Sequence, residues 1–192
     1  MKLSRVNTSL FIAILVINLY IILAPVTPML TFWLSRHTSG SYSQLTSQLG
    51  NSPASIKTTP KDNRLVIPAM LLDQPINEGK DISAARTQPW RRPNTSTPDK
   101  GGNTVIVAHR YTYTSPKGSF YYLDKLKLND EIGVFWQGKR YLYKVINVKV
   151  VAPTDTSIEN QTQDSRLTLY TCTPLWLPKD RLVVTSELES QP

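Results

Sequence analysis

Three residues of this 192-residue chain have the types that cysteine-based nucleophilic catalysis needs: Cys172, His109 and Arg181. A thiol is a strong nucleophile only as its thiolate, which forms beside a base or a cation. An imidazole can take up and return the proton, and a guanidinium holds several donors in a fixed fork that suits a developing oxyanion. Taken singly, each residue has a plainer interpretation, as a buried thiol, a surface histidine and a solvated arginine.

Each of the three stands at one end of a segment rich in β-branched and apolar residues, a composition typical of strands. Cys172 follows the segment LTLYT, His109 ends the segment TVIVAH, and Arg181 opens the segment RLVV. Along the chain, 63 residues separate His109 from Cys172 and 9 separate Cys172 from Arg181. If the three strands are neighbours, the three side chains converge on one rim of a sheet.

Composition narrows the possible functions. Cys172 is the only cysteine, which excludes an intramolecular disulfide and a multi-cysteine metal site. The only other histidine, His37, lies in a polar segment and is interpreted as solvated, so no metal and no other cofactor is expected. The formal net charge is +8, but the basic residues are spread along the chain. Without a dense basic run the charge favours cell-envelope surroundings over a nucleic-acid partner.

The C-terminal two thirds of the chain have the pattern of a β-protein. Strands are predicted over residues 65–70, 104–109, 131–136, 141–151, 166–171 and 181–188. Turn formers separate them, among them Gln137–Gly138, and the segment 120–126 is the best candidate for a helical turn. Alternation predicts that Leu142, Ile146, Val148 and Val150 face a core. Short strands at this density predict an all-β barrel or sandwich.

The N-terminal third predicts an anchor followed by a tether. Residues 10–34 are almost wholly apolar, and the basic residues of segment 1–9 predict a transmembrane helix with a cytoplasmic N-terminus and an extracellular remainder. The alternative is a cleaved signal peptide, because residues 10–24 alone have the length of its apolar region. The polar segment 35–63 predicts a flexible linker, within which Tyr42, Leu45 and Leu49 are spaced for one amphipathic turn. Residues 64–192 form the predicted catalytic domain.

Several motifs occur together in that domain. Residues 168–172 read TLYTC, residues 102–110 read GNTVIVAHR, and residues 181–184 read RLVV. They resemble, in the same order, the TLxTC, GNxVIxGHR and arginine-bearing strand motifs of the sortase family. The resemblance covers residues 64–188 and departs at Ala108, where many relatives have glycine. Within the family, the short chain and the absence of a clear lid favour resemblance to a general or a class D/E-like enzyme. Residues 90–93, which contain Pro93, are interpreted as an ordinary loop rather than as the lid found in pilus-building members.

The resemblance implies a closed β-barrel of about eight strands with short helices, preceded by the one transmembrane helix. It implies a cysteine transpeptidase in which Cys172 is the nucleophile, His109 the acid and base, and Arg181 the oxyanion-stabilising group. Thr171 would help to position the substrate. The implied substrates are secreted proteins that carry an LPxTG-like sorting signal near their C-terminus. The implied acceptor is an amine of a cell-wall precursor or of a pilin-like protein. Loops 152–164 and 173–180, the latter with Trp176, are the predicted groove walls.

Three other functions are compatible with parts of the sequence. The same site with water as the acceptor would make a membrane-anchored cysteine endopeptidase. A degenerate site would leave a non-catalytic β-domain displayed on the surface, although Cys172, His109 and Arg181 are all present. A basic barrel that binds nucleic acid is the third alternative, and no stripe of aromatic and basic residues supports it.

Overall fold

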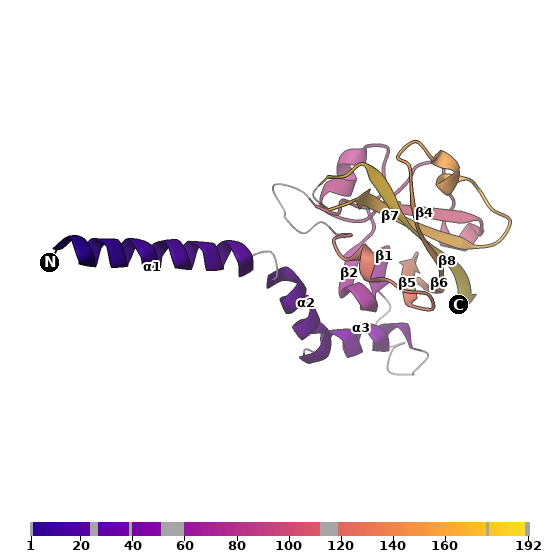
Figure 1. The fold of residues 1–192 in the computed structure, drawn as a ribbon. Coiled ribbons are helices and arrows are strands. Elements are labelled where there is room, and N and C mark those ends of the chain that lie inside the picture. Colours follow the sequence, from indigo (N-terminus) through magenta and orange to yellow (C-terminus); the bar gives the residue numbers. More distant parts are fainter. Residues whose placement is uncertain are drawn as a thin grey trace. The chain divides into compact units, whose positions relative to one another are not determined.

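The computed structural model describes residues 2–23, 27–38, 40–50, 60–111, 119–175 and 177–190 (Figure 1). The chain forms two compact units, Met1–Tyr42 and Ser43–Pro192. The first unit holds helices α1 (Lys2–Leu23) and α2 (Thr27–Thr38). The second holds the sheet, several short 3₁₀ helices and most of helix α3 (Ser41–Leu49). The sequence-based boundaries after residues 34 and 63 stay predictions.

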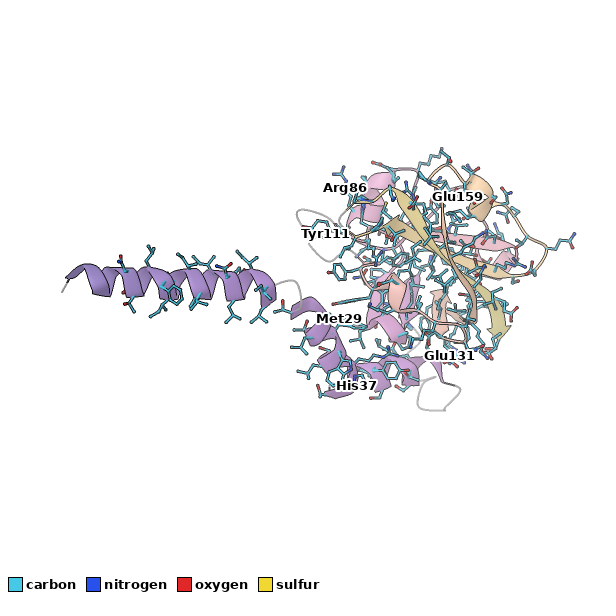
Figure 2. The ribbon with its side chains drawn as sticks, viewed as in Figure 1. Met29, His37, Arg86, Tyr111, Glu131 and Glu159 are labelled. Carbon is cyan, nitrogen blue, oxygen red and sulfur yellow. The ribbon has the colours of Figure 1, made fainter. Side chains whose placement is uncertain are left out.

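The described part of the apolar N-terminal segment is helical. Helix α1 ends at Leu23 and helix α2 begins at Thr27, while Pro25, where a kink or helix end was predicted, lies outside the described residues. Among the described residues, no helix has both the length and the apolar character that crossing a membrane requires. The predicted transmembrane helix over residues 10–34 is therefore not confirmed. His37 belongs to α2, where its Nδ1 lies 2.8 Å from the carbonyl oxygen of Trp33 (Figure 2).

The second unit is built on strands, as predicted. The strands of the described residues are β1 (Arg64–Ile67), β2 (Leu72–Pro75), β3 (Trp90–Arg91), β4 (Asn103–Val107), β5 (Glu131–Trp136), β6 (Lys139–Val151), β7 (Arg166–Thr173) and β8 (Asp180–Ser190). The 3₁₀ helices are η2 (Pro68–Met70), η3 (Ile82–Arg86), η4 (Pro98–Lys100), η5 (Leu123–Lys125) and η6 (Thr156–Glu159). All six predicted strands are present, with shifted ends, and η5 confirms the predicted helical turn. The short strands β2 and β3 were missed.

The strands form one curled sheet in the order β2-β1-β5-β6-β8-β7-β4-β3. The predicted closed barrel is wrong, because β2 and β3 are the two edges of this sheet and form no ladder with each other. A single bridge between Asn77 and Trp90 joins the chain after β2 to β3. Pro75, the last residue of β2, has no backbone N–H to extend a ladder, and β3 is only two residues long. The fold is therefore an open half-barrel rather than a closed one.

One side of the sheet encloses the main core. On β6 the residues that enter this core are Tyr141, Tyr143 and Val145. The predicted inward set was partly wrong, since Ile146 is 38% exposed and Val150 is 58% exposed. The pairing of β6 with β8 shifts register twice, between residues 142 and 143 and between 145 and 147. At the second shift the extra residue, Ile146, lies on β6, so the inward side chains change from odd to even positions there and a strict period of two cannot be carried along the strand.

Helix α3 covers part of the opposite face of the sheet. Leu49 packs with Phe135 and Leu142 in a second, smaller apolar cluster, and Arg140 donates to the carbonyl oxygens of Leu49 and Gly50. A β-carbon at Gly133 would overlap the Cδ2 atom of Leu49, so glycine leaves the notch that this side chain fills. The structure thus places a packed helix within the interval 35–63, for which composition predicts a flexible linker.

We expect Leu49→Ala to lower the free energy of unfolding by about 2–4 kcal/mol, because it empties a closely packed notch. Gly133→Ala alone should also destabilise, whereas in the Leu49→Ala background its methyl group enters the space that leucine left. Denaturant unfolding of the two single variants and the double variant measures this coupling. Additive losses in the double variant would contradict the proposed fit of Leu49 against Gly133.

Candidate active site

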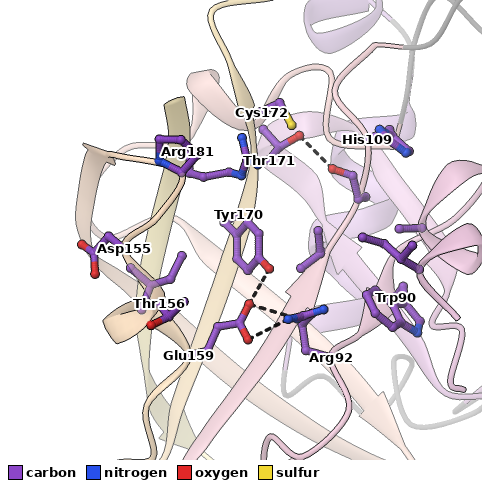
Figure 3. A pocket seen from close by; sticks show the side chains of 16 residues that line it. Trp90, Arg92, His109, Asp155, Thr156, Glu159, Tyr170, Thr171, Cys172 and Arg181 are labelled. Atoms are coloured by element: carbon purple, nitrogen blue, oxygen red, sulfur yellow. Dashed lines mark hydrogen bonds and ion pairs between the residues drawn. The ribbon is translucent and has the colours of Figure 1, made fainter. Parts of the chain in front are cut away.

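The three chemically suited residues line one cavity of about 260 Å³ at an end of the curled sheet (Figure 3). Its walls come from η3, β3, the end of β4, the segment after β6, β7 and the start of β8. The lining residues are Ile82, Ala85, Trp90, Arg92, Val107, Ala108, His109, Pro153, Asp155, Thr156, Ile158, Glu159, Tyr170, Thr171, Cys172 and Arg181. The predicted convergence of Cys172, His109 and Arg181 on one rim is what the structure shows.

The antiparallel pairing of β7 with β8 brings Cys172 and Arg181 together. The two residues are direct partners in the register of this ladder. Directly opposite side chains on one face of an antiparallel pair have Cβ atoms about 4.5–5.5 Å apart. Figure 3 shows the guanidinium of Arg181 extending toward Cys172, and its Nη1 donates a hydrogen bond to the carbonyl oxygen of Asp180 at 3.2 Å. No carboxylate among the described residues forms an ion pair with it, which leaves the fork available to an oxyanion.

The parallel pairing of β4 with β7 leads toward His109 and Cys172, which both line the cavity just past the end of this ladder. In this register Val107 is the partner of Tyr170, an offset of 63 residues. The same offset of 63 residues separates His109 from Cys172, each of which lies two residues beyond the last pair of the ladder. The buried hydroxyl of Thr171 donates to the carbonyl oxygen of Ala108 at 2.8 Å and so continues the contact beyond the ladder. This bond holds the strand end that carries His109, while the predicted substrate-positioning role of Thr171 stays a prediction.

The surroundings of His109 favour its neutral form. Its backbone N–H donates to the carbonyl oxygen of Ala85 at 3.3 Å, which sets η3 against the ring's own segment. Burial lowers the pKa of His109 from its ordinary 6.5, and the positive charge of Arg86 on η3 lowers it further. A neutral imidazole beside a thiol can act as a base at physiological pH.

The ring signals of His109 in a proton NMR titration are expected to have a midpoint below pH 6.5. Because the unfolded chain binds this proton more readily, the stability contribution of the neutral ring is present above pH 6.5 and is lost as the pH falls through the folded-state pKa. Arg86→Gln removes the smaller of the two causes, so the midpoint should rise but stay below the ordinary value. A midpoint at or above 6.5 in the native protein would contradict the described burial.

Arg110 ties the two strand ends that carry the reactive residues. Its Nη1 donates to Oγ1 of Thr173 at 2.9 Å, and its Nη2 lies 3.0 Å from Oδ1 of Asp124. Arg110 follows His109 in the chain and Thr173 follows Cys172. The hydrogen bond between Arg110 and Thr173 therefore connects the segment of His109 to the segment of Cys172. Arg110 was visible in the sequence as the last residue of the motif at residues 102–110, but this role was not predicted for it.

The groove wall was predicted in part. The segment 152–164 supplies five lining residues, as expected, but no described residue of segment 173–180 lines the cavity, and Trp176 lies outside the described residues. The interpretation of residues 90–93 as an ordinary loop was wrong at its start, since Trp90 is a buried strand residue and Trp90 and Arg92 both line the cavity. The short sequence of residues 90–93 contains no feature that indicates a strand or a place in the cavity wall. Within the described part of the chain, His, Cys, Asp and Glu side chains do not gather in any group of three suited to a metal ion.

Comparison with known proteins agrees with this geometry. Residues 65–189 match the family model described as the sortase domain. A curated protein, sortase SrtE1 of Streptomyces coelicolor, is 32% identical over an alignment of 104 residues, and the match covers 49% of this chain and 29% of that protein. The present chain therefore matches less than a third of that relative's length.

Solved sortase structures share the fold. Sortase E1 of Streptomyces coelicolor, solved with a tripeptide in its active site, has a TM-score of 0.60 at 27% identity and covers 69% of this chain and 90% of its own. Sortase C1 of Streptococcus agalactiae has a TM-score of 0.61 at 26% identity, covering 80% and 77%. Sortase C-1 of Actinomyces oris has a TM-score of 0.61 at 27% identity, covering 73% and 84%. With the family model matched along nearly the whole sheet unit, this chain belongs to the sortase family.

Proposed function

We propose that this sortase is a cysteine transpeptidase that cleaves a sorting signal and transfers the acyl part to an amine. The observation that carries the proposal is the meeting of two strand residues and a residue just past a strand end in one cavity. Cys172 pairs with Arg181 across β7 and β8, and His109 stands at the same offset from Cys172 as the β4–β7 ladder prescribes. A nucleophile, a base and a cationic donor fork are the set that acyl transfer through a thioester uses.

In the first step, the sulfur of Cys172 attacks a backbone carbonyl carbon of the substrate while His109 takes the thiol proton. The lowered pKa of His109 supports this role, because the resting ring is neutral and can accept a proton. The carbonyl oxygen becomes an oxyanion, which the guanidinium of Arg181 stabilises. The C–N bond then breaks, and the imidazolium gives its proton to the departing amine. The acyl group remains on Cys172 as a thioester.

In the second step, an amine attacks the thioester carbon and His109 takes the proton that the amine loses. The tetrahedral intermediate again places negative charge on the oxygen beside Arg181. The C–S bond breaks, the thiolate of Cys172 leaves, and the imidazolium returns a proton to it. The site is then restored, and the product is an amide between the substrate protein and the acceptor.

The proposed substrates are secreted proteins with an LPxTG-like signal, and the proposed acceptor is an amine of a cell-wall precursor or of a pilin-like protein. The apolar lining by Ile82, Ala85 and Val107 supports an apolar residue in such a signal. Ile82 is 64% exposed although it lines the cavity, so apolar surface is presented to an arriving peptide. The related Streptomyces coelicolor enzyme holds a tripeptide in its active site.

We also propose that the apolar N-terminal segment keeps the enzyme at the outer face of the membrane. The side chains of Leu10–Leu23 are almost all large, apolar and exposed along α1. An enzyme and a substrate that are both held at one membrane meet at a raised effective concentration, so weak recognition suffices. Membrane pelleting of the full chain under alkaline extraction tests this, and release into the supernatant would contradict it.

The activity is tested by incubating the full chain with a panel of LPxTG-like peptides and an amine acceptor and identifying the products by mass spectrometry. The proposal predicts a ligated peptide in the wild-type sample and none with Cys172→Ala. Cleaved peptide without ligation, across several amines, would replace the transpeptidase by a cysteine endopeptidase. No product of either kind, with Cys172 inert to thiol reagents, would leave a non-catalytic β-domain.

A further inference from the structure

The wall of the cavity formed by residues 153–159 has no ladder to hold it. This segment contains η6 and follows the end of β6, outside the sheet. Its own turns are short: Asp155 accepts a hydrogen bond from the backbone N–H of Ser157 at 3.0 Å, and the N–H of Asn160 donates to the carbonyl oxygen of Ser157 at 3.1 Å. Local bonds of this kind shape the segment but do not fix its distance from Cys172. That distance depends on contacts with the sheet.

The backbone around Glu159 is bound by Asn103, the first residue of β4. The Nδ2 atom of this buried asparagine donates to the carbonyl oxygens of Ile158, at 3.1 Å, and of Asn160, at 3.0 Å. Its Oδ1 atom accepts from the buried hydroxyl of Thr168 on β7, at 2.8 Å. Asn103 belongs to β4 and Thr168 to β7, so these hydrogen bonds attach the C-terminal end of the wall to the sheet.

The carboxylate of Glu159 is bound on both oxygens by side chains that line the same cavity (Figure 3). Nε of Arg92 lies 2.9 Å from Oε1, and Nη2 of Arg92 donates to Oε2 at 3.1 Å. The hydroxyl of Tyr170 donates to Oε1 at 2.5 Å. The guanidinium of Arg92 also lies over the ring of Trp90, 5.3 Å from its centre. We call Arg92, Glu159 and Tyr170 the clasp.

Two features make the clasp stronger than an ordinary surface ion pair. The pair is bidentate and its side chains are only 32% and 24% exposed, so geometry and partial desolvation both favour it. The third partner also remains a donor, because burial, followed by the nearby Glu159 carboxylate, raises the pKa of Tyr170 and keeps its hydroxyl protonated. The clasp therefore persists wherever the enzyme is folded at neutral pH.

Tyr170 connects the clasp to the nucleophile. It stands two residues before Cys172 on β7, and both side chains line the cavity, as the period of two along a strand requires. The wall is thus fastened to the strand that carries Cys172. A wall that is fixed before the peptide arrives need not be ordered during binding, which lowers the entropic cost of association.

We propose that Arg92, Glu159 and Tyr170 are positioning residues that hold the wall of residues 153–159 in its peptide-binding position and thereby set the affinity for the sorting signal. The inference rests on the proposed transpeptidase function. None of the three residues is assigned a role in the acyl-transfer steps, so their loss should act on KM and leave kcat nearly unchanged. No sequence motif contains all three residues of the clasp. Tyr170 occupies the variable position of the TLxTC motif, Glu159 lies in the wall, and Arg92 follows β3.

The test measures kcat and KM of the full chain with one LPxTG-like peptide and one amine, for Glu159→Gln, Arg92→Gln and Tyr170→Phe. Tyr170→Phe removes only one hydroxyl group, so it is the variant least expected to misfold and separates loss of the clasp from loss of the fold. Arg91→Gln is the matched control, because Arg91 is the neighbouring arginine, pairs with Glu78 at 2.6 Å and does not line the cavity. We expect KM to rise about tenfold in Glu159→Gln and Arg92→Gln, the equivalent of one lost charge-assisted contact, with kcat within about twofold.

The double variant Arg92→Gln/Glu159→Gln should be no worse than the worse single variant, because both substitutions break one clasp. Hydrogen exchange at the amides of Ser157 and Asn160, measured without peptide, should be faster in each clasp variant than in Arg91→Gln. Unchanged KM in an active enzyme, or a kcat that falls as far as kcat/KM, would overturn the inference. A wild-type chain that forms no Cys172-dependent product would overturn the proposed function instead, and exchange rates equal to those of the control would overturn the clasp by themselves.

Discussion

Cys172→Ala is expected to lower kcat/KM for acyl transfer by at least about 1000-fold while the peptide's dissociation constant changes little. The thiol supplies the atom that forms the thioester, and no other cysteine exists in the chain to replace it. The side chain is only partly buried and lies outside both apolar core clusters, so its removal should not unfold the sheet. Steady-state kinetics and fluorescence titration of a labelled peptide measure the two quantities.

Cys172→Ser provides the matched variant, since it keeps the size and a hydroxyl while removing the acidity of the thiol. Its kcat should also fall by orders of magnitude, because His109 would have to deprotonate a far weaker acid. The unfolding midpoints of both variants should match the wild type. Ligation by Cys172→Ala at more than about a tenth of the wild-type rate would show that the nucleophile lies elsewhere.

Arg181→Ala is expected to lower kcat about 100- to 1000-fold, the effect of removing a donor from a developing oxyanion. Arg181 pairs with Cys172 across β7 and β8, and no carboxylate of the described residues neutralises it. Arg181→Lys keeps the charge but loses the planar fork, so it should recover only part of the rate. The effect belongs to kcat because the oxyanion exists only after attack. Single-turnover kinetics of peptide cleavage report it directly.

Arg166→Lys is the control for this series. Arg166 opens β7, the strand that carries Cys172, and pairs with Asp164 at 2.5 Å, but it does not line the cavity. Its replacement should leave kcat within about twofold of the wild type, as is usual for an exposed ion pair. If Arg181→Lys is as active as Arg166→Lys, the guanidinium is not the oxyanion donor.

The three residues that line the cavity could be singled out from the sequence because their chemistry and their places at strand ends are local features, while their catalytic roles stay predictions. Cys172, His109 and Arg181 each adjoin an apolar segment, and those segments became β7, β4 and β8. To predict that the three residues converge, one must know which strands are neighbours. The sequence alone does not give this, and it was inferred from the resemblance of the motifs to those of the sortase family. The structure gives the physical reason, since the β4–β7 register has the same offset of 63 that separates His109 from Cys172.

The clasp could not be predicted, because its members are joined only by the fold. Arg92 and Glu159 are 67 residues apart in the chain and meet because both flank the end of the sheet that holds Tyr170. Each residue alone resembles an ordinary solvated side chain. Asn103 was visible as part of a motif, but its role depends on carbonyl groups of Ile158 and Asn160, which no side-chain pattern records.

The open sheet was missed, and of α3 the sequence indicated only one amphipathic turn, whose Leu45 and Leu49 are indeed buried, but not its packing on the sheet. Strand β3 has two residues, too few for any alternation to be seen, and β2 ends at a proline. The family resemblance suggested closure, whereas a single bridge joins the chain after β2 to β3 and the two edge strands do not pair. Leu49 lies in a polar segment, and its burial depends on the notch at Gly133, far along the chain. Pairing across such distances is set by tertiary packing rather than by local propensity.

The most direct test of the thioester mechanism is the intact mass of the full chain after brief mixing with an LPxTG-like peptide and rapid acid quenching, without an amine acceptor. A thioester on Cys172 makes a fraction of the protein heavier by the mass of the acyl part of the peptide. Peptide mapping should place that mass on Cys172, and added amine or hydroxylamine should remove it. An unmodified chain that nevertheless releases cleaved peptide, or an adduct on any residue other than Cys172, would contradict the thioester mechanism.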